Sequence, residues 1–459
     1  MLGVLFCVIT GKIVAEIASP LLLVALSLLA VGLVSFLSPK IGLTIIIFSM
    51  IFSPKFEGIK LSEAHIHGAV ILKVEDILLI IIFLAWFVRA AVVKRLPFLT
   101  HTRLNLPMFL YIFTCLTSTC LAYLRGELQG LRAFFYIVKY FEYYLLYFMT
   151  VNIVENRQDV MRYLRYGWIT AILVTCYGYW SMTLGERVTV PFNEAFGSKD
   201  LGNEANTFGG YYLVIFAVLL AQFIHPSAGF SWWAWATLLF MMPPFLLTLS
   251  RSSYIGLTGA LLFLLGLKTR KRLNLLFWVG LILIAFLFIP SVQKSVGDRI
   301  AFTFKGTGNL ETMQLGSSTT LKLESSAMQR VTSWRDILLV KFPQHPLIGC
   351  GVTAVGLVDV QYPRVLGETG LFGLFFFLWL LYRLWKLSWS LYSEAAHPQD
   401  RALALGMLTA LVGLLFHGFG ANTFIIVRIM EPFWFLAALV ARSHINLRNT
   451  QASIQRGYA

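Results

Sequence analysis

The chain has 459 residues, of which 58% are hydrophobic and 13% are charged, and its formal net charge is +15. Soluble proteins carry about 25% charged residues, so this composition excludes soluble enzymes, disordered proteins and fibrous proteins and indicates a membrane protein. Because cytoplasmic loops and anionic lipid account for excess positive charge in such a protein, membrane lipid is an expected partner and nucleic acid is not.

Apolar runs predict an all-α fold, a polytopic bundle of about 12–14 transmembrane helices, since each span needs about 20 apolar residues. Residues 1–19 predict an extra span or an interfacial helix, because they lack the basic start of a cleavable signal peptide. The run 41–53 is short enough for a bent or paired half-helix. The predicted spans are 20–37, 41–53, 74–93, 104–122, 131–151, 163–184, 207–224, 231–249, 252–267, 273–290, 366–389, 402–420 and 423–441.

The basic cluster Lys268–Arg272 sets the expected orientation, because basic loops stay in the cytoplasm. Counting spans outward from it gives 18 Lys and Arg in the cytoplasmic segments and 8 in the short outer segments. The cytoplasmic segments are 38–40, 88–103, 152–166, 225–231, 268–272, 383–401 and 442–459. The short outer segments are 54–73, 122–132, 185–206 and 250–252.

The domain organisation expected is a first set of spans over 1–290, a long periplasmic loop over 291–365, C-terminal spans over 366–441 and a cytoplasmic tail over 442–459. A loop of this length is usually functional. Within it, residues 326–342 predict an amphipathic helix that places Met328, Val331, Trp334, Ile337 and Leu338 on one side.

An arginine separates two apolar runs at the predicted outer face, in the segment LLTLSRSSYIGL. A guanidinium with neighbouring hydroxyls suits a phosphate, so Arg251 with Ser250 and Ser252 is a candidate phosphate site. The alternative is an interfacial anchor whose side chain reaches the lipid headgroups.

The span 131–151 carries a polar stripe, because Arg132, Tyr136, Lys139 and Tyr143 share one helix face. Ionisable residues inside a span normally face the bundle interior or a wet cavity. Either Lys139 and Glu142 form a structural ion pair, or Arg132 lies on the wall of a polar cavity.

Two other predicted spans begin with polar residues. Asn203 and Asn206 open a span, where asparagine caps a helix or binds sugar hydroxyls. Glu75 and Asp76 complement a helix dipole.

Farther along the chain, His417 lies near the outer end of its span, and Arg428 and Glu431 are spaced for an internal ion pair. The glycines at 349, 351 and 356 do not match the dinucleotide fingerprint, and Walker, zinc and kinase motifs are missing.

This set of features resembles the O-antigen ligase and O-antigen polymerase superfamily. The matching text is LTLSRSSYIGL, a basic cytoplasmic loop between two spans, and a long outer loop that ends in HPLIGCGVTAVG before DVQYPRVLGETGLFGLFFFL. By motif the resemblance covers roughly residues 200–440, and by hydropathy it covers the whole chain. It implies a membrane core similar to that of lipid-linked sugar transferases, with Arg251 as the match to the family's pyrophosphate-binding arginine.

The resemblance also implies the chemistry. The donor is a glycan on undecaprenyl pyrophosphate at the periplasmic face of the bacterial inner membrane, and the acceptor is a glycan, a lipid or a protein. Many ligases have a His-Asn-x-x-Leu stretch where this chain has Asp359 to Pro363, which favours a polymerase-like member or a ligase for another acceptor.

Transfer requires positive groups for the departing pyrophosphate and a general base for the acceptor hydroxyl, and no metal or other cofactor is expected. The candidate bases are Asp359, Glu368 and His345. The candidate substrate-binding residues are Arg251, Arg132, Arg330, Arg335, Ser250, Ser252, Asn203 and Asn206.

Two rival classes stay open. A transporter or flippase of lipid-linked or anionic substrates tends to show inverted repeats and charges near the membrane midplane. Here no repeat is visible, and the polar residues concentrate at the predicted outer face. The third class is a membrane scaffold without catalytic activity.

Overall fold

The computed structural model describes residues 20–52, 73–93, 100–128, 132–184, 187–191, 202–226, 231–267, 277, 279–281, 297, 310–315, 319–356 and 359–457. Residues 1–19, the basic cluster 268–272 and almost all of the span predicted over 273–290 lie outside the described residues.

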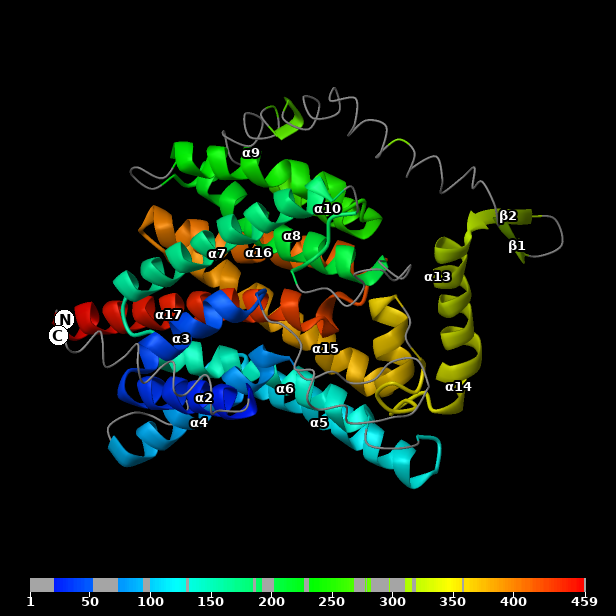
Figure 1. Cartoon of the computed structure of the whole chain (residues 1–459), viewed down its shortest axis with the longest axis horizontal. Helices are drawn as coiled ribbons and strands as arrows, with labels where there is room; N and C mark the ends of the chain where they lie inside the picture. The colour runs from blue at the N-terminus through cyan, green and yellow to red at the C-terminus, as the bar shows by residue number, and fades with distance from the viewer. Residues whose placement is uncertain are drawn as a thin grey trace.

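The described part of the chain is almost entirely helical, as the composition predicts (Figure 1). Every predicted span within it coincides with a helix. These helices are α2 (Pro20–Leu37), α3 (Pro39–Ser49), α4 (Val74–Val93), α5 (Asn105–Leu124), α6 (Arg132–Ile153), α7 (Arg157–Thr183), α8 (Gly202–Ile224), α9 (Ser231–Leu247), α10 (Arg251–Gly266), α15 (Gln361–Glu394), α16 (Pro398–His417) and α17 (Val427–Gly457).

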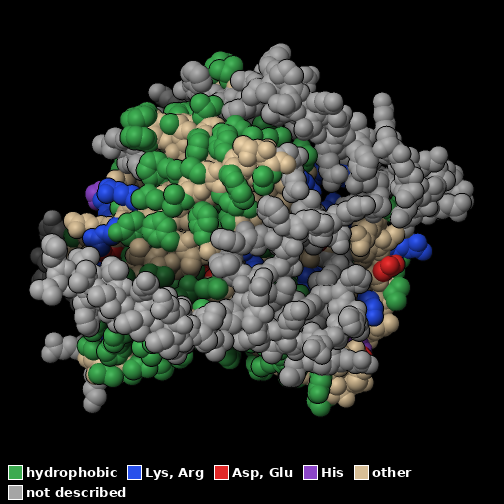
Figure 2. All heavy atoms as spheres, viewed as in Figure 1, with side chains coloured by type: hydrophobic (Ala, Val, Ile, Leu, Met, Phe, Trp, Pro, Cys, Tyr) green, Lys and Arg blue, Asp and Glu red, His purple; other side chains and the backbone are tan. Residues whose placement is uncertain are grey.

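Five of the described helices, or parts of them, are long and apolar enough to cross a membrane. They are Val74–Val93, Asn105–Leu124, Ala205–Ile224, Gln361–Glu394 and Pro398–His417. Shorter apolar segments are Val24–Leu37, Pro39–Ser49 and Trp232–Leu247. The chain is therefore a multi-pass membrane protein, and Figure 2 shows hydrophobic side chains over much of the described surface on one face.

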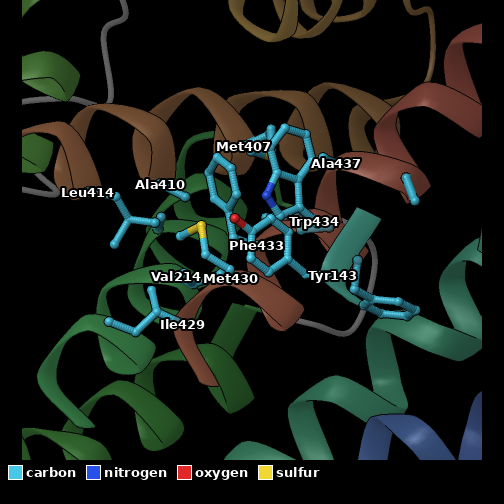
Figure 3. Close-up of a cluster of buried hydrophobic side chains, with 14 of the residues drawn as sticks. Tyr143, Val214, Met407, Ala410, Leu414, Ile429, Met430, Phe433, Trp434 and Ala437 are labelled. Atoms are coloured by element: carbon cyan, nitrogen blue, oxygen red, sulfur yellow. The ribbon is translucent and has the colours of Figure 1, made fainter. Parts of the chain in front are cut away.

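The core lies where α6, α8, α16 and α17 pack together. Figure 3 shows Tyr143 of α6, Val214 of α8 and Met407 of α16 around Phe433 and Trp434 of α17. Small residues at the contacts let such helices approach closely.

The segments predicted to share the cytoplasmic side meet at one end of the bundle. Lys40, in the first turn of α3, lies 2.9 Å from Asp159 of α7. Arg157 lies 3.5 Å from Asp400 of α16, and Arg442 of α17 donates to a main-chain carbonyl beside α7.

The segments predicted to share the outer side meet at the other end. His345 lies 2.9 Å from Glu127, and Ser250 lies 2.7 Å from Asn206. Figure 1 shows α13 (Ser325–Asp336) on the opposite side of the view from the C-terminal end of α17. The segments predicted for each side thus lie together at one end of the bundle. Which end faces the cytoplasm stays a prediction.

The long insert contains a hairpin that the sequence did not predict. Strands β1 (Leu310–Leu315) and β2 (Thr319–Glu324) pair antiparallel and lead directly into α13. The helix then continues through a π-helical stretch η1 (Ile337–Lys341) and α14 (Phe342–Gln344). Met328 and Ile337 are buried as expected, but Leu338 is exposed, because the wider π turn changes the direction of the following side chains.

Two helices extend beyond the predicted span limits. α15 begins at Gln361 rather than 366, so part of the predicted loop is helical. α17 continues to Gly457, through the predicted tail, because no proline interrupts residues 442–457.

The motifs HPLIGCG and ETGLFG form one structural unit. The main chain of 346–351 hydrogen-bonds to a break in α15, with Cys350 N donating to Gly367 O at 3.0 Å and Leu371 N donating to Pro346 O at 2.9 Å. Gly370 has φ +66° at the break. A Cβ at Gly349, which has φ +84°, would lie 2.4 Å from the carbonyl oxygen of Glu368. The close approach requires glycine at both positions.

The orientation predicts which introduced cysteines react with a membrane-impermeant thiol reagent. In a variant whose native cysteines are replaced by serine, Gln344→Cys should be labelled from outside intact inner-membrane spheroplasts and Thr450→Cys should not. Both residues are exposed, at opposite ends of the bundle. The reverse pattern would invert the sidedness.

Gly349→Ala should lower the apparent melting temperature of the detergent-purified protein more than Gly356→Ala. Both glycines have positive φ, +84° and +81°, so both substitutions add about 1–2 kcal/mol of backbone strain. Only Gly349 adds a clash, since no atom of the described residues lies within 4 Å of a Cβ at Gly356. Equal losses for the two variants would contradict the docked arrangement.

Candidate functional site

A polar cavity of about 260 Å³ lies at the predicted outer end of the bundle, between α6, α8, α15 and α17. It is lined by segments from five parts of the sequence, so it exists only in the folded bundle. The lining residues are Lys73, Tyr136, Asn206, Thr207, Asp359, Arg364, Ala421, Asn422, Ile425, Ile426, Val427 and Arg428.

The cavity has a positive charge balance. Lys73, Arg364 and Arg428 contribute cations to its wall, and Asp359 contributes the carboxylate among its lining residues. Arg330 of α13 lies 4.0 Å from Asp359, so a further cation stands beside that carboxylate. A cavity of this charge suits an anionic ligand.

Arg364 is the best placed of these groups to bind an anion. Its side chain is only 3% exposed, and its Nε donates to Glu368 Oε1 at 2.9 Å. Its Cζ lies 5.9 Å from the ring centroid of Tyr136, within the range of a cation–π contact. Its Nη2 is buried without a hydrogen-bond partner among the described residues. A buried, unsatisfied guanidinium nitrogen at a cavity wall is a donor available for a ligand.

Glu368 is a positioning residue in this arrangement. Its carboxylate accepts from Arg364 and from the Thr353 main-chain N–H at 2.8 Å. Its own carbonyl accepts from Ser118 Oγ at 2.6 Å and from Gly351 N at 2.9 Å. Glu368 is not among the residues that line the cavity. It therefore orients the guanidinium of Arg364 rather than facing the space where a ligand would lie.

Asp359 is the predicted base that faces the cavity. It lies in the segment before α15. Burial raises the pKa of its carboxyl, and the charges of Arg330 and Arg364 oppose that rise. A carboxylate with a raised pKa holds a proton more readily, which suits a general base.

The junction before α10 lies next to the cavity through Asn206. Ser250 donates to Asn206 Oδ1 at 2.7 Å, and it caps α10 by accepting from Ser253 N at 3.3 Å. Ser250 and Ser252 are buried, and these bonds make Ser250 a cap and a link between helices. Arg251 is half-buried at the start of α10, and the described cavity lining does not include it.

Asn206 lies one turn inside its helix, because α8 begins at Gly202. Capping was therefore the wrong interpretation for Asn206, which instead accepts from Ser250 and lines the cavity. α6 begins at Arg132, and Asn203 lies in the first turn of α8, but the side chains of both lie outside the described part.

The remaining predicted site residues lie away from the cavity. His345 bonds Glu127 at 2.9 Å, and Glu127 also lies 3.0 Å from Arg125, so this base candidate belongs to a surface cluster. Arg335 is exposed on α13.

A buried cluster of charges lies beside the cavity and involves α4, α6 and α17. Lys139 contacts Asp76 and lies 3.2 Å from Glu142. Glu431 interacts electrostatically with Asp76 and Glu142. Glu75 interacts with Lys73, at 3.9 Å, and with Arg428. We name Glu75, Asp76, Lys139, Glu142 and Glu431 the charged cluster.

The charged cluster explains how two cations are held at the cavity wall. Lys73 and Arg428 line the cavity, and both interact electrostatically with Glu75 of the cluster. Arg428 also donates to Pro191 O at 2.9 Å. The pairing predicted for Lys139 and Glu142 is confirmed, and the cluster extends it to α4 and α17.

The substrate-binding residues predicted from the sequence included Arg251 and Arg132 but not Arg364 or Arg428. The available signal was that both lie beside predicted outer ends of spans, where a charge inside an apolar run requires a partner or water. Tyr136 belonged to the predicted stripe, and it does line the cavity.

Comparison with protein-family models finds no match for this chain, and comparison with curated proteins finds none either.

Removing the lysine of the charged cluster should destabilise the protein strongly. Lys139→Met leaves buried carboxylates without their cation, which is expected to lower stability by about 3–5 kcal/mol. Lys40→Met is the matched control, because Lys40 also contacts two carboxylates, Glu155 at 3.3 Å and Asp159 at 2.9 Å, but its side chain is 39% exposed. That change should lower stability by about 1 kcal/mol or less. The apparent melting temperatures of the two purified variants give the comparison, and similar values would show that the cluster is not a buried ionic network.

Proposed function

We propose that this protein transfers a glycan from undecaprenyl pyrophosphate to an acceptor at the periplasmic face of the bacterial inner membrane. It acts as an O-antigen ligase or as a polymerase of O-antigen or exopolysaccharide, without a metal. In this proposal the bundle has about 12–14 spans, and the insert 291–365 is periplasmic.

The observation that carries the proposal is the positive cavity. Two arginines and a lysine line it together with Asp359. A pyrophosphate carries several negative charges, and guanidinium groups bind its oxygens with paired hydrogen bonds. The motif segments that carry the family resemblance pack against each other and hold Arg364 at this cavity.

Arginines in this position would stabilise mainly the transition state, in which the bond between the sugar and the phosphate breaks. The bond between the sugar anomeric carbon and the phosphate oxygen is cleaved, and the electron pair leaves with the pyrophosphate. Arg364 and Arg428 would stabilise that growing charge, and the bonds to Glu368 and Pro191 O already fix their positions. Groups that are fixed in advance contribute most, because they do not reorganise during the reaction.

Asp359 would serve as the general base. It would take the proton of the acceptor hydroxyl as that oxygen bonds to the anomeric carbon. Arg330 lies 4.0 Å away and would hold the carboxylate toward the cavity. Asn206 and Asn422 offer amide groups in the same wall for sugar hydroxyls.

Arg251 would contribute at the entrance to this site. Its neighbour Ser250 donates a hydrogen bond to Asn206, which lines the cavity. Through Asn206, the start of α10 lies next to the cavity in which the pyrophosphate would bind. The resemblance assigns a pyrophosphate role to this arginine. The geometry supports this role more directly for Arg364 and Arg428, because both line the cavity.

The charged cluster favours a second candidate, a flippase or transporter. Ionisable groups inside a helix bundle often form ion or proton paths. Reconstitution into vesicles separates the two functions, because a flippase moves a fluorescent polyprenyl-phosphate lipid between leaflets without forming a glycosidic bond.

Arg364→Gln should abolish glycan transfer, with a loss of about 100-fold to 1,000-fold, because a fixed donor to the leaving group is removed. Arg335→Gln is the matched control and should keep the wild-type level, since Arg335 is exposed on α13. The measurement is the surface glycan profile of a deletion strain that expresses each variant at equal membrane levels. A wild-type profile from Arg364→Gln would refute the proposed role of the cavity.

Asp359→Asn should reduce transfer by about 100-fold to 10,000-fold. Because the base must be deprotonated, the wild-type rate should fall as pH falls through the pKa of Asp359. That pKa is raised by burial, so the fall should begin at a higher pH than for an ordinary aspartate. The rate of transfer by membrane fractions across pH gives the profile. A fully active Asp359→Asn variant would exclude this base.

A further inference from the structure

A second charged cavity lies at the predicted cytoplasmic end of the bundle, between α15, α17 and the segment before α5. Its volume is about 350 Å³. It shares α15 and α17 with the first cavity but lies toward the other end of both helices. The lining residues are His101, Thr102, Arg103, Leu387, Ala441, His444, Ile445, Arg448 and Asn449.

Cationic groups converge on this space. Arg103 and Arg448 approach it from different parts of the chain, and both interact electrostatically with His444. His444 is only 6% exposed and lies 3.2 Å from Ser390 Oγ. The carboxylate near these groups is Glu394, which accepts from Arg448 at 3.1 Å. The lining itself contributes guanidinium and imidazole groups and no carboxylate.

Part of the cavity lining is apolar, and large hydrophobic side chains are exposed on two neighbouring helices. Leu387, Ala441 and Ile445 supply apolar lining. Leu106 and Trp389, on α5 and α15, are exposed large hydrophobic side chains close to the lining residues in sequence. Exposed tryptophan beside polar residues marks the level of lipid headgroups. Figure 2 shows Lys, Arg and His side chains at the left-hand end, where Figure 1 places the C-terminal end of α17.

We infer that this cavity binds the phosphate group of an anionic phospholipid from the adjacent leaflet. The guanidinium groups of Arg103 and Arg448 pair with the phosphate oxygens, the buried ring of His444 lines the inner side of the site, and the acyl chains lie along α5 and α15. Basic pockets between helices at the cytoplasmic side are suited to anionic headgroups, which are enriched there. The inference is independent of the proposed glycan transfer, since it uses a different cavity.

The test is native mass spectrometry of the purified full-length protein after delipidation. Phosphatidylglycerol or phosphatidylcholine with the same acyl chains is then added back. The wild type should retain phosphatidylglycerol more tightly than phosphatidylcholine. Arg103→Gln should weaken phosphatidylglycerol binding about fivefold, and Arg103→Gln with Arg448→Gln about 25-fold, because each basic residue near a headgroup contributes about this factor.

A matched control removes the same charge from the same end of the bundle. Arg162→Gln with Arg165→Gln changes two exposed arginines of α7 that do not line this cavity, and its binding should equal that of the wild type. Arg103 is exposed, so its single substitution tests the site without disturbing buried packing.

Two results would overturn the inference. The first is equal binding by the cavity variants and the control, which would mean general attraction by a basic surface. The second is displacement of the lipid by inorganic phosphate, together with phosphate binding in micelles that contain no anionic lipid. That result would assign the cavity to a soluble phosphate compound.

Discussion

The ion pair between Arg364 and Glu368 holds the predicted outer end of the molecule in its arrangement. Both side chains are 3% exposed, at an N–O distance of 2.9 Å. A buried ion pair requires further hydrogen bonds to offset its desolvation, and Glu368 receives one from the Thr353 N–H. The segment 346–351 must therefore dock against α15, and that docking places Arg364 beside Tyr136.

The need to pair buried charges also constrains the charged cluster. Its carboxylates come from α4, α6 and α17, so these helices must pack in one register for Lys139 to contact Asp76 and Glu142. Because Lys73 and Arg428 are held by the cluster and also line the cavity, the packing of the bundle and the charge of the site depend on each other. Apolar packing around Trp434 fills the space deeper in the bundle (Figure 3).

The two charged cavities are suited to different kinds of chemistry. One is lined by a carboxylate together with two arginines and a lysine, an arrangement suited to bond breaking and proton transfer. The other has guanidinium and imidazole groups beside apolar lining residues, an arrangement suited to holding an amphiphile. Both sit at the ends of α15 and α17, which connect them.

The sequence by itself determined the helices, since long apolar runs have few alternatives in a membrane, and it also indicated which segments share an end. It predicted Asp359 and Asn206 for the site, and the local pairing of Lys139 with Glu142. It could not rank Arg364 above Arg251, because each is an arginine at the edge of an apolar run. Only the tertiary structure decided that ranking. Burial and the position of each nitrogen relative to a cavity depend on contacts between residues more than 100 positions apart, such as those of Arg364 with Tyr136 and Arg428 with Pro191.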